Sequence, residues 1–155
     1  MTTREVAERL YACFQAQDGE GMAALYAPSA RFSDPVFPSL DGAGVGDMWR
    51  MLASRAKDFS LVVDGIEHEG EVARVRWTAH YLFSATGRAV VNRVSSTIRV
   101  RDGLIVEQRD AFDFRKWARQ AFGLAGMFLG GRGFFQRRVQ AKAAENLAAF
   151  RSSRS

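Results

Sequence analysis

The chain has 155 residues, of which 47% are hydrophobic and 25% are charged. This length and mixture fit one soluble globular domain and exclude a disordered, collagen-like or disulfide-rich protein. The formal charge of +5 is uneven, because residues 1–113 carry 13 Lys/Arg and 16 Asp/Glu (net −3), whereas residues 114–155 carry 9 Lys/Arg and one acid (net +8). We therefore predict a domain at 1–113 and a basic helical extension at 114–155 that packs on it.

The first third of the chain predicts three helices. Thr2 and Glu5 have the spacing of a capping box, so the first helix should begin near residue 3. A short second helix is expected over residues 20–26, ended by Pro28. A third is expected over residues 45–56, where apolar residues recur at helical spacing. Residues 30–38 between them favour β structure.

The middle of the chain predicts four strands in series, over residues 59–68, 72–83, 89–101 and 104–113. The links between them are short and contain glycine, which favours an antiparallel meander. Helices that precede strands in this way indicate an α+β fold.

The hairpin between the last two strands decides which side chains share a face. A three-residue loop at 101–103 pairs Val100 with Leu104 and places both apolar faces on one side of the sheet. A two-residue turn would place the side chains of Ser96 and Asp110 on opposite faces of the sheet. We therefore predict the three-residue loop.

The basic C-terminal segment predicts a helix over residues 114–122, a glycine-rich connector over 123–133 and a helix over 134–150. We expect the last helix to pack across the domain or onto a second subunit. The less favoured alternative is that it lies on an anionic membrane surface. Nucleic-acid binding is not expected, since the rest of the chain is net acidic.

Two carboxylates are the candidate catalytic residues. Asp110 lies between apolar residues on the inward face of the last strand, where burial should raise its pKa and suit it to proton transfer. The alternative is a structural carboxylate bonded to Asn92, Ser96 or an arginine. Asp34 precedes a proline in an aromatic segment and is either the partner of Asp110 or a turn residue.

The same inward faces supply the predicted pocket. Its expected residues are Phe32, Trp77, Tyr81, Phe83, Asn92, Val94, Ser96, Gln108 and Phe112. No metal site is expected, because the chain has one cysteine and two histidines. The single Cys13 and the absence of an apolar segment at the N-terminus predict a cytoplasmic protein.

Two segments carry a family resemblance. Residues 25–35 (LYAPSARFSDP) and residues 109–113 (RDAFD) resemble stretches of the nuclear transport factor two-like superfamily, in its branch of SnoaL-like polyketide cyclases and limonene-epoxide hydrolases. The resemblance covers about residues 3–120. It implies a cone-shaped, curved antiparallel sheet packed on N-terminal helices, and a homodimer formed through the outer face of the sheet.

The resemblance also implies roles for individual residues. Asp34 falls where ketosteroid isomerases keep a proton-shuttling aspartate, and Asp110 falls where the cyclases and epoxide hydrolases hold an acid/base aspartate. The oxyanion-hole pair of the isomerases would fall near Leu10 and Ser96, and the epoxide-opening acid of the hydrolases would fall at Ala79, so both are missing.

These observations favour a SnoaL-like enzyme, of cyclase, isomerase or hydrolase type, that transfers a proton on a lipophilic small molecule without a cofactor. The alternatives are a non-catalytic protein that binds a hydrophobic small molecule, and a membrane-surface or interaction module that uses the basic tail.

Overall fold

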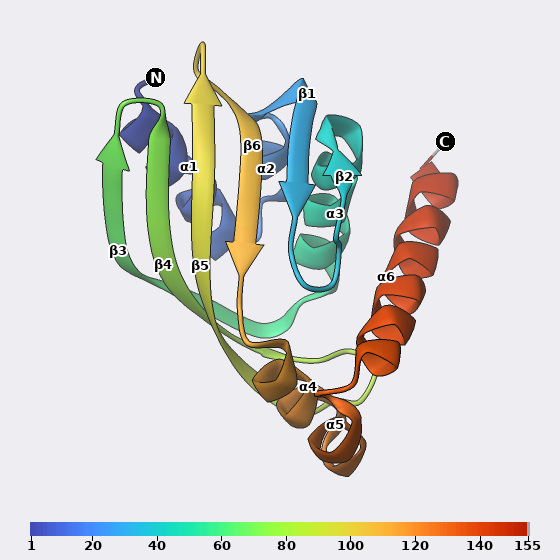
Figure 1. The fold of residues 1–155 in the computed structure, drawn as a ribbon. Coiled ribbons are helices and arrows are strands. Elements are labelled where there is room, and N and C mark those ends of the chain that lie inside the picture. The colour runs from blue at the N-terminus through green and yellow to red at the C-terminus, as the bar shows by residue number, and fades with distance from the viewer. Residues whose placement is uncertain (155) are drawn as a thin grey trace.

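The structure is a computed structural model that describes residues 1–154. Two helices come first in the chain, two strands and a third helix follow, and four further strands precede the last three helices (Figure 1). The helices are α1 (Thr3–Gln15), α2 (Gly19–Ala23), α3 (Gly42–Arg55), α4 (Phe114–Phe122), α5 (Leu124–Leu129) and α6 (Gly133–Arg154). The strands are β1 (Tyr26–Ser33), β2 (Leu40–Asp41), β3 (Lys57–Glu69), β4 (Val72–Leu82), β5 (Ala89–Arg101) and β6 (Leu104–Ala111).

One curved sheet organises the molecule, with the strand order β2-β1-β6-β5-β4-β3. The predicted meander of β3 to β6 is confirmed, and so is the α+β class. The sheet is not purely antiparallel, because β1 runs parallel to β6. Helices α1 to α3 lie behind the sheet in Figure 1, and the main core fills the space between them.

The capping box at the start of α1 is confirmed. The Glu5 amide donates to the Thr2 hydroxyl at 3.1 Å, and the Thr2 amide donates to the Glu5 carboxylate at 3.2 Å. The helix buries Val6, Leu10 and Phe14 on the face that meets the sheet. The predicted second helix is wrong at its end, because Tyr26 already belongs to β1, where pairing with β6 overrides its local preference.

The predicted loop between β5 and β6 is also wrong. Asp102 and Gly103 form a two-residue turn in which both residues have positive φ, 53° and 76°. This turn pairs Arg101 with Leu104. Two positive φ angles are typical of the hairpin turn that suits the natural twist of two strands, and the sequence Asp-Gly favours it.

A β-bulge next to this turn restores the facing that the sequence pattern requires. The register of the ladder shifts between Arg99 and Val100, and Val106 is the extra residue. Beyond the bulge, Ser96 pairs with Asp110 and both side chains face inward. The prediction that Asp110 lies on the core side was therefore correct, although the predicted turn was not.

The last three helices, which we call the helical cover (residues 114–154), pack against one end and one side of the sheet (Figure 1). Within the predicted connector, α5 lies directly on α4, because a Cβ at Gly126 would overlap the Ala118 carbonyl. Leu147 of α6 is only 4% exposed and joins the main core. The Gln136 and Gln140 side-chain amides both donate to the Pro35 carbonyl, at 3.0 and 3.1 Å.

The C-terminal half of α6 is tied to the N-terminal helices by ion pairs. Arg151 contacts Asp47 at 3.0 Å, and Arg154 lies 3.6 Å from Glu20. Arg50 of α3 joins the same group through Glu20 and Asp47, at 2.8 and 2.9 Å. These basic side chains of α6 therefore have acidic partners within the molecule.

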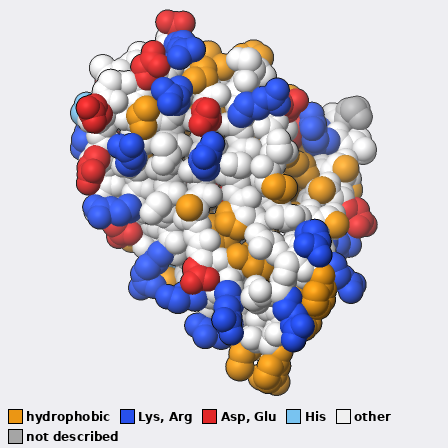
Figure 2. All heavy atoms as spheres, viewed as in Figure 1, with side chains coloured by type: hydrophobic (Ala, Val, Ile, Leu, Met, Phe, Trp, Pro, Cys, Tyr) orange, Lys and Arg blue, Asp and Glu red, His pale blue; other side chains and the backbone are white. Residues whose placement is uncertain are grey.

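Side chains on the surface differ between the two ends of the molecule. Figure 2 shows Lys/Arg and Asp/Glu mixed over the outer face of the sheet, and hydrophobic side chains at the opposite tip. The tip contains exposed residues of α5, namely Leu124, Met127 and Phe128. None of the helices within residues 1–154 has the length and apolarity that are needed to cross a membrane.

Candidate active site

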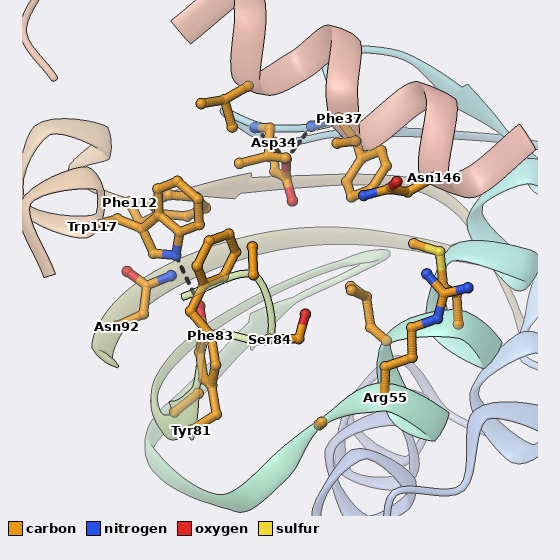
Figure 3. A pocket seen from close by; sticks show the side chains of 18 of the residues that line it. Asp34, Phe37, Arg55, Tyr81, Phe83, Ser84, Asn92, Phe112, Trp117 and Asn146 are labelled. Carbon is orange, nitrogen blue, oxygen red and sulfur yellow. Dashed lines mark hydrogen bonds between the residues drawn. The ribbon is translucent and has the colours of Figure 1, made fainter. Parts of the chain in front are cut away.

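A cavity of about 550 Å³ lies between the inner face of the sheet, α3 and the helical cover (Figure 3). Eight of the predicted site residues line it: Asp34, Trp77, Tyr81, Phe83, Asn92, Val94, Asp110 and Phe112. Three others lie behind its wall. Phe32 packs against Trp49 in the core, and Ser96 and Gln108 are buried beside Asp110.

Asp110 is held on the inner face of β6 by two buried polar neighbours. Its carboxylate accepts a hydrogen bond from the Gln108 amide at 3.0 Å, and the neighbouring Ser96 hydroxyl also favours its charged form. The side chain is only 5% exposed, and this burial raises its pKa to about 7 against the opposing effect of the two donors. Asp110 can therefore exchange a proton near neutral pH.

A chain of hydrogen bonds fixes the orientation of the Gln108 amide. The Trp49 indole N–H donates to the Tyr26 hydroxyl at 2.9 Å, and that hydroxyl donates to Gln108 Oε1 at 2.5 Å. Because Oε1 accepts from Tyr26, the amide NH₂ must point toward Asp110. The Trp49 N–H can only donate, so the Tyr26 hydroxyl accepts from it and donates its own proton to Gln108. The amide that donates to Asp110 is therefore positioned before any ligand binds.

Ser96 is oriented in the same way from the other side. The Trp77 indole N–H donates to Ser96 Oγ at 2.8 Å. Because this bond uses a lone pair of Oγ, the hydroxyl proton of Ser96 stays available to an acceptor such as Asp110. Both donors to the carboxylate are thus supported by a buried tryptophan.

Asp34 lies just beyond the end of β1, at the start of a tight turn. One carboxylate oxygen accepts from the Val36 and Phe37 amides, at 2.7 and 2.6 Å. Burial raises the pKa of Asp34 to about 6, although these two bonds favour the charged form. In Figure 3 the carboxyl group points into the cavity. The negative charge of Asp34 also contributes to the raised pKa of Asp110.

Tyr81 joins the sheet to the helical cover inside the cavity. The Trp117 indole N–H donates to its hydroxyl at 2.9 Å, as the dashed line in Figure 3 shows. Burial raises the pKa of Tyr81 to about 12, so it stays protonated near neutral pH. This bond fixes α4 against β4 beside Asn92 and Phe83.

Tyr11 is not among the predicted site residues, although its helix face can be read from the sequence. Ala7, Tyr11 and Phe14 follow the spacing of one helix face, and all are buried. The Tyr11 hydroxyl lies near Ser96, and burial raises its pKa well above the usual value. Within residues 1–154 it has no hydrogen bond of normal geometry.

The rim of the cavity was not predicted either. It contains Arg55 at the end of α3, and Arg138, Lys142 and Asn146 on α6. Arg55 and Asn146 lie on one side of the cavity in Figure 3, and Trp117 lies on the opposite side. Helix α6 is distant in sequence from α3 and from the strands that form most of the cavity, so only its apolar spacing could have signalled this position.

The described part of the chain places two titratable carboxyl groups in one apolar cavity. Their pKa values, about 6 and about 7, allow one to be ionised while the other holds a proton. Residues 1–154 contain no group of three His, Cys, Asp or Glu side chains arranged to hold a metal ion. The chemistry that this arrangement supports directly is proton transfer.

Comparison with known proteins agrees with this fold. The SnoaL-like domain matches residues 7–108, which is more than half of the chain. The chain belongs to the SnoaL-like family. The match ends before Asp110. No match was found among curated protein sequences.

Several solved structures resemble this SnoaL-like protein. IdmH of Streptomyces antibioticus, a proposed polyketide cyclase, is 25% identical with a TM-score of 0.65, over 77% of this chain and 98% of that one. An LEH-like epoxide hydrolase of M. tuberculosis is 19% identical with a TM-score of 0.66, over 82% and 95%. A protein of Catenulispora acidiphila with a ketosteroid isomerase-like fold is 9% identical with a TM-score of 0.66, over 76% and 92%. These likenesses confirm the predicted cone-shaped, nuclear transport factor two-like fold.

Proposed function

We propose that this SnoaL-like protein is a cofactor-independent enzyme that moves a proton on a lipophilic, carbonyl-bearing small molecule. The observation that carries the proposal is the place of Asp110, a carboxyl group with a pKa of about 7 in the wall of an apolar cavity. General acid–base catalysis is most effective when the pKa of the catalytic group lies near the working pH.

The cavity supports the substrate class. Its volume of about 550 Å³ falls within the range of small-molecule sites, and such sites combine mostly apolar walls with a few polar groups. Phe14, Phe59 and Phe83 are among the apolar walls, and the two carboxyl groups are the acids that reach the interior. The description of IdmH as a proposed polyketide cyclase agrees with a substrate of this kind.

The two carboxyl groups divide the work by their pKa values. Asp34 has the lower pKa and two amide donors, so in the singly protonated pair it is the ionised member and the proton resides on Asp110. Asp34 then accepts a proton from the carbon next to the carbonyl, while Asp110 donates its proton to the carbonyl oxygen. The product is an enol, and the pair carries the same total charge as before.

The test is deuterium exchange of β-tetralone, a small lipophilic ketone, followed by proton NMR in deuterium oxide. We expect the wild-type protein to accelerate exchange, and Asp110→Asn and Asp34→Asn each to lose about 100-fold or more of that acceleration. The matched control is Glu107→Gln, which makes the same change on the outer face of β6 and should exchange like wild type. Equal exchange by wild type and Asp110→Asn would contradict the proposal. If β-tetralone binds without faster exchange, the protein is a binding protein instead.

A further inference from the structure

We propose that the ligand of this cavity carries an anionic group on its lipophilic body, and that Arg55, Arg138 and Lys142 at the rim bind that group. The inference rests on the proposed function only in using the same cavity. It adds a class of substrate, an amphiphilic acid, and a direction in which it enters.

The first support is that the rim brings basic side chains from two separate helices together. Arg55 stands in the last turn of α3, and Arg138 and Lys142 stand one helical turn apart on α6. All three are exposed and line the cavity. Side chains at this spacing on a helix share one face, so α6 presents Arg138 and Lys142 together toward the opening.

The second support is that these cations have few acidic partners. Within residues 1–154, neither Arg55 nor Arg138 forms an ion pair. Lys142 lies 3.6 Å from Glu145, but both side chains are well exposed, and such pairs contribute little. Arg55 lies over the Phe150 ring, 5.7 Å from its centroid, and this contact leaves the charge uncompensated.

Other cations on the same helix show the contrast. Arg151 and Arg154 have Asp47 and Glu20 as partners, and they tie α6 to the N-terminal helices. The cations of α6 therefore include a paired, structural set and a set at the cavity, Arg138 and Lys142, without a strong acidic partner within residues 1–154. Arg137 belongs to neither set, because it forms no ion pair there and does not line the cavity. A structural role accounts for the first set only.

The third support is the order of polar groups along the cavity. The carboxyl group of Asp34 projects from one wall, while Arg55 and Asn146 lie at the α3–α6 side (Figure 3). Aromatic side chains, including Phe37, Phe59 and Phe83, fill the walls. A molecule with an apolar body can thus place a carbonyl near the carboxyl pair and an anionic group at the rim.

Two fluorescent dyes that differ in one charge test the proposal. Anilinonaphthalene sulfonate carries a sulfonate, and N-phenylnaphthylamine has the same ring system without it. Energy transfer from Trp49, Trp77 and Trp117 reports binding in the cavity, since all three tryptophans line it. We expect the sulfonate dye to bind more tightly, and its affinity to fall as the salt concentration rises.

The double variant Arg55→Gln/Arg138→Gln should weaken binding of the sulfonate dye about five- to tenfold and leave that of the neutral dye unchanged. The matched control Arg93→Gln removes an exposed arginine of β5 that does not line the cavity, and should bind both dyes like wild type. A second control, Phe128→Ser, removes an exposed side chain of α5 and excludes dye binding at that tip.

Each outcome decides one question. If both dyes bind equally well and the double variant changes neither, the anionic class is overturned while the proposed function stands. If neither dye binds, the lipophilic cavity itself fails, and both proposals fall together.

Discussion

The sheet wall around Asp110 and the helical cover differ in how they are held. Around Asp110 the hydrogen bonds are fully buried and run from Trp49 through Tyr26 to Gln108, with the Tyr11 hydroxyl as the unpartnered exception within residues 1–154. The cover is tied to the rest of the domain by hydrogen bonds that are part-buried or exposed, through Trp117, Gln120 and Gln136 among others. Ion pairs of Arg151 and Arg154 add to them, and apolar and basic side chains of the cover are left exposed.

Because of this difference, the two regions can serve separate purposes, one the proton-transfer reaction and the other the selection of the ligand. A catalytic group needs a fixed environment, since its pKa depends on burial and on the donors around it. A surface that admits a ligand needs exposed side chains and weaker attachments. The wall therefore sets the proton chemistry, and the cover with the end of α3 sets which molecule reaches it.

The largest change in stability is expected from a substitution that weakens the packing of the cover on the main core. Leu147→Ala should lower the free energy of unfolding by about 2–4 kcal/mol, because Leu147 is buried in the main core. Urea denaturation measures the change. Leu124→Ala, which truncates an exposed leucine of the cover, is the control and should have almost no effect. A loss below about 1 kcal/mol for Leu147→Ala would mean that α6 contributes little to the core.

Two buried tyrosines test the fixed environment of the wall. Tyr26→Phe should cost about 1–3 kcal/mol, because it leaves the Trp49 N–H and the Gln108 carbonyl without their partner. Tyr11→Phe should be neutral or stabilising, because Tyr11 is buried and its hydroxyl has no hydrogen bond of normal geometry within residues 1–154. Similar losses for both variants in thermal denaturation would contradict the network as described.

Asp110→Asn should change stability in a way that depends on pH. The folded pKa of Asp110, about 7, lies above the ordinary value of 3.8, so ionisation of this group destabilises the fold as pH rises from 4 to 7. The variant lacks this loss and should be more stable than wild type by about 1–2 kcal/mol above pH 7, since part of the relief is offset by a poorer bond to Ser96.

The same variant should match wild type below pH 4, where the carboxyl group is protonated in both states. Denaturation curves across this pH range give the comparison. A variant that is much less stable than wild type at pH 8 would show that Asp110 is a structural carboxylate with a low pKa.

The smallest expected effect on stability concerns the outer face of the sheet, where we propose that two copies of the chain meet. That face presents Arg74, Arg76, Thr78 and His80, with exposed Val62 beside them. His80→Glu should change stability by less than about 0.5 kcal/mol but weaken the dimer. Light scattering should give twice the 17.2 kDa chain mass for wild type and for the control Arg119→Glu. A wild-type protein that is monomeric at micromolar concentration would overturn the dimer.

The sequence predicts the wall better than the cover. Alternation along β4 and β5 correctly placed Trp77, Val94 and Ser96 on the inner side, because a strand buried on one face repeats every two residues. The facing of Asp110 followed from the same rule. The bulge at Val106 could not be placed, because one extra residue leaves little trace in the pattern and Ile105 is equally apolar.

The rim could not be predicted because it depends on distant segments. Arg55 and Arg138 are far apart in sequence, and each alone resembles an ordinary solvated charge. Likewise, the bond from Tyr26 to Gln108 joins residues 82 positions apart. Local patterns report which face a residue takes, but they do not report which two faces meet.

The parallel pairing of β1 with β6 has a consequence for the order of folding. The meander of β3 to β6 is built from neighbours in sequence, and α1 and α2 are local as well. Strand β1, by contrast, must wait for β6, because Phe32 pairs with Gln108. Contacts between such distant segments form late, since the chain must first close a long loop. Asp34 follows β1 and Asp110 lies near the end of β6, so the two carboxyl groups come together only when β1 is inserted beside β6.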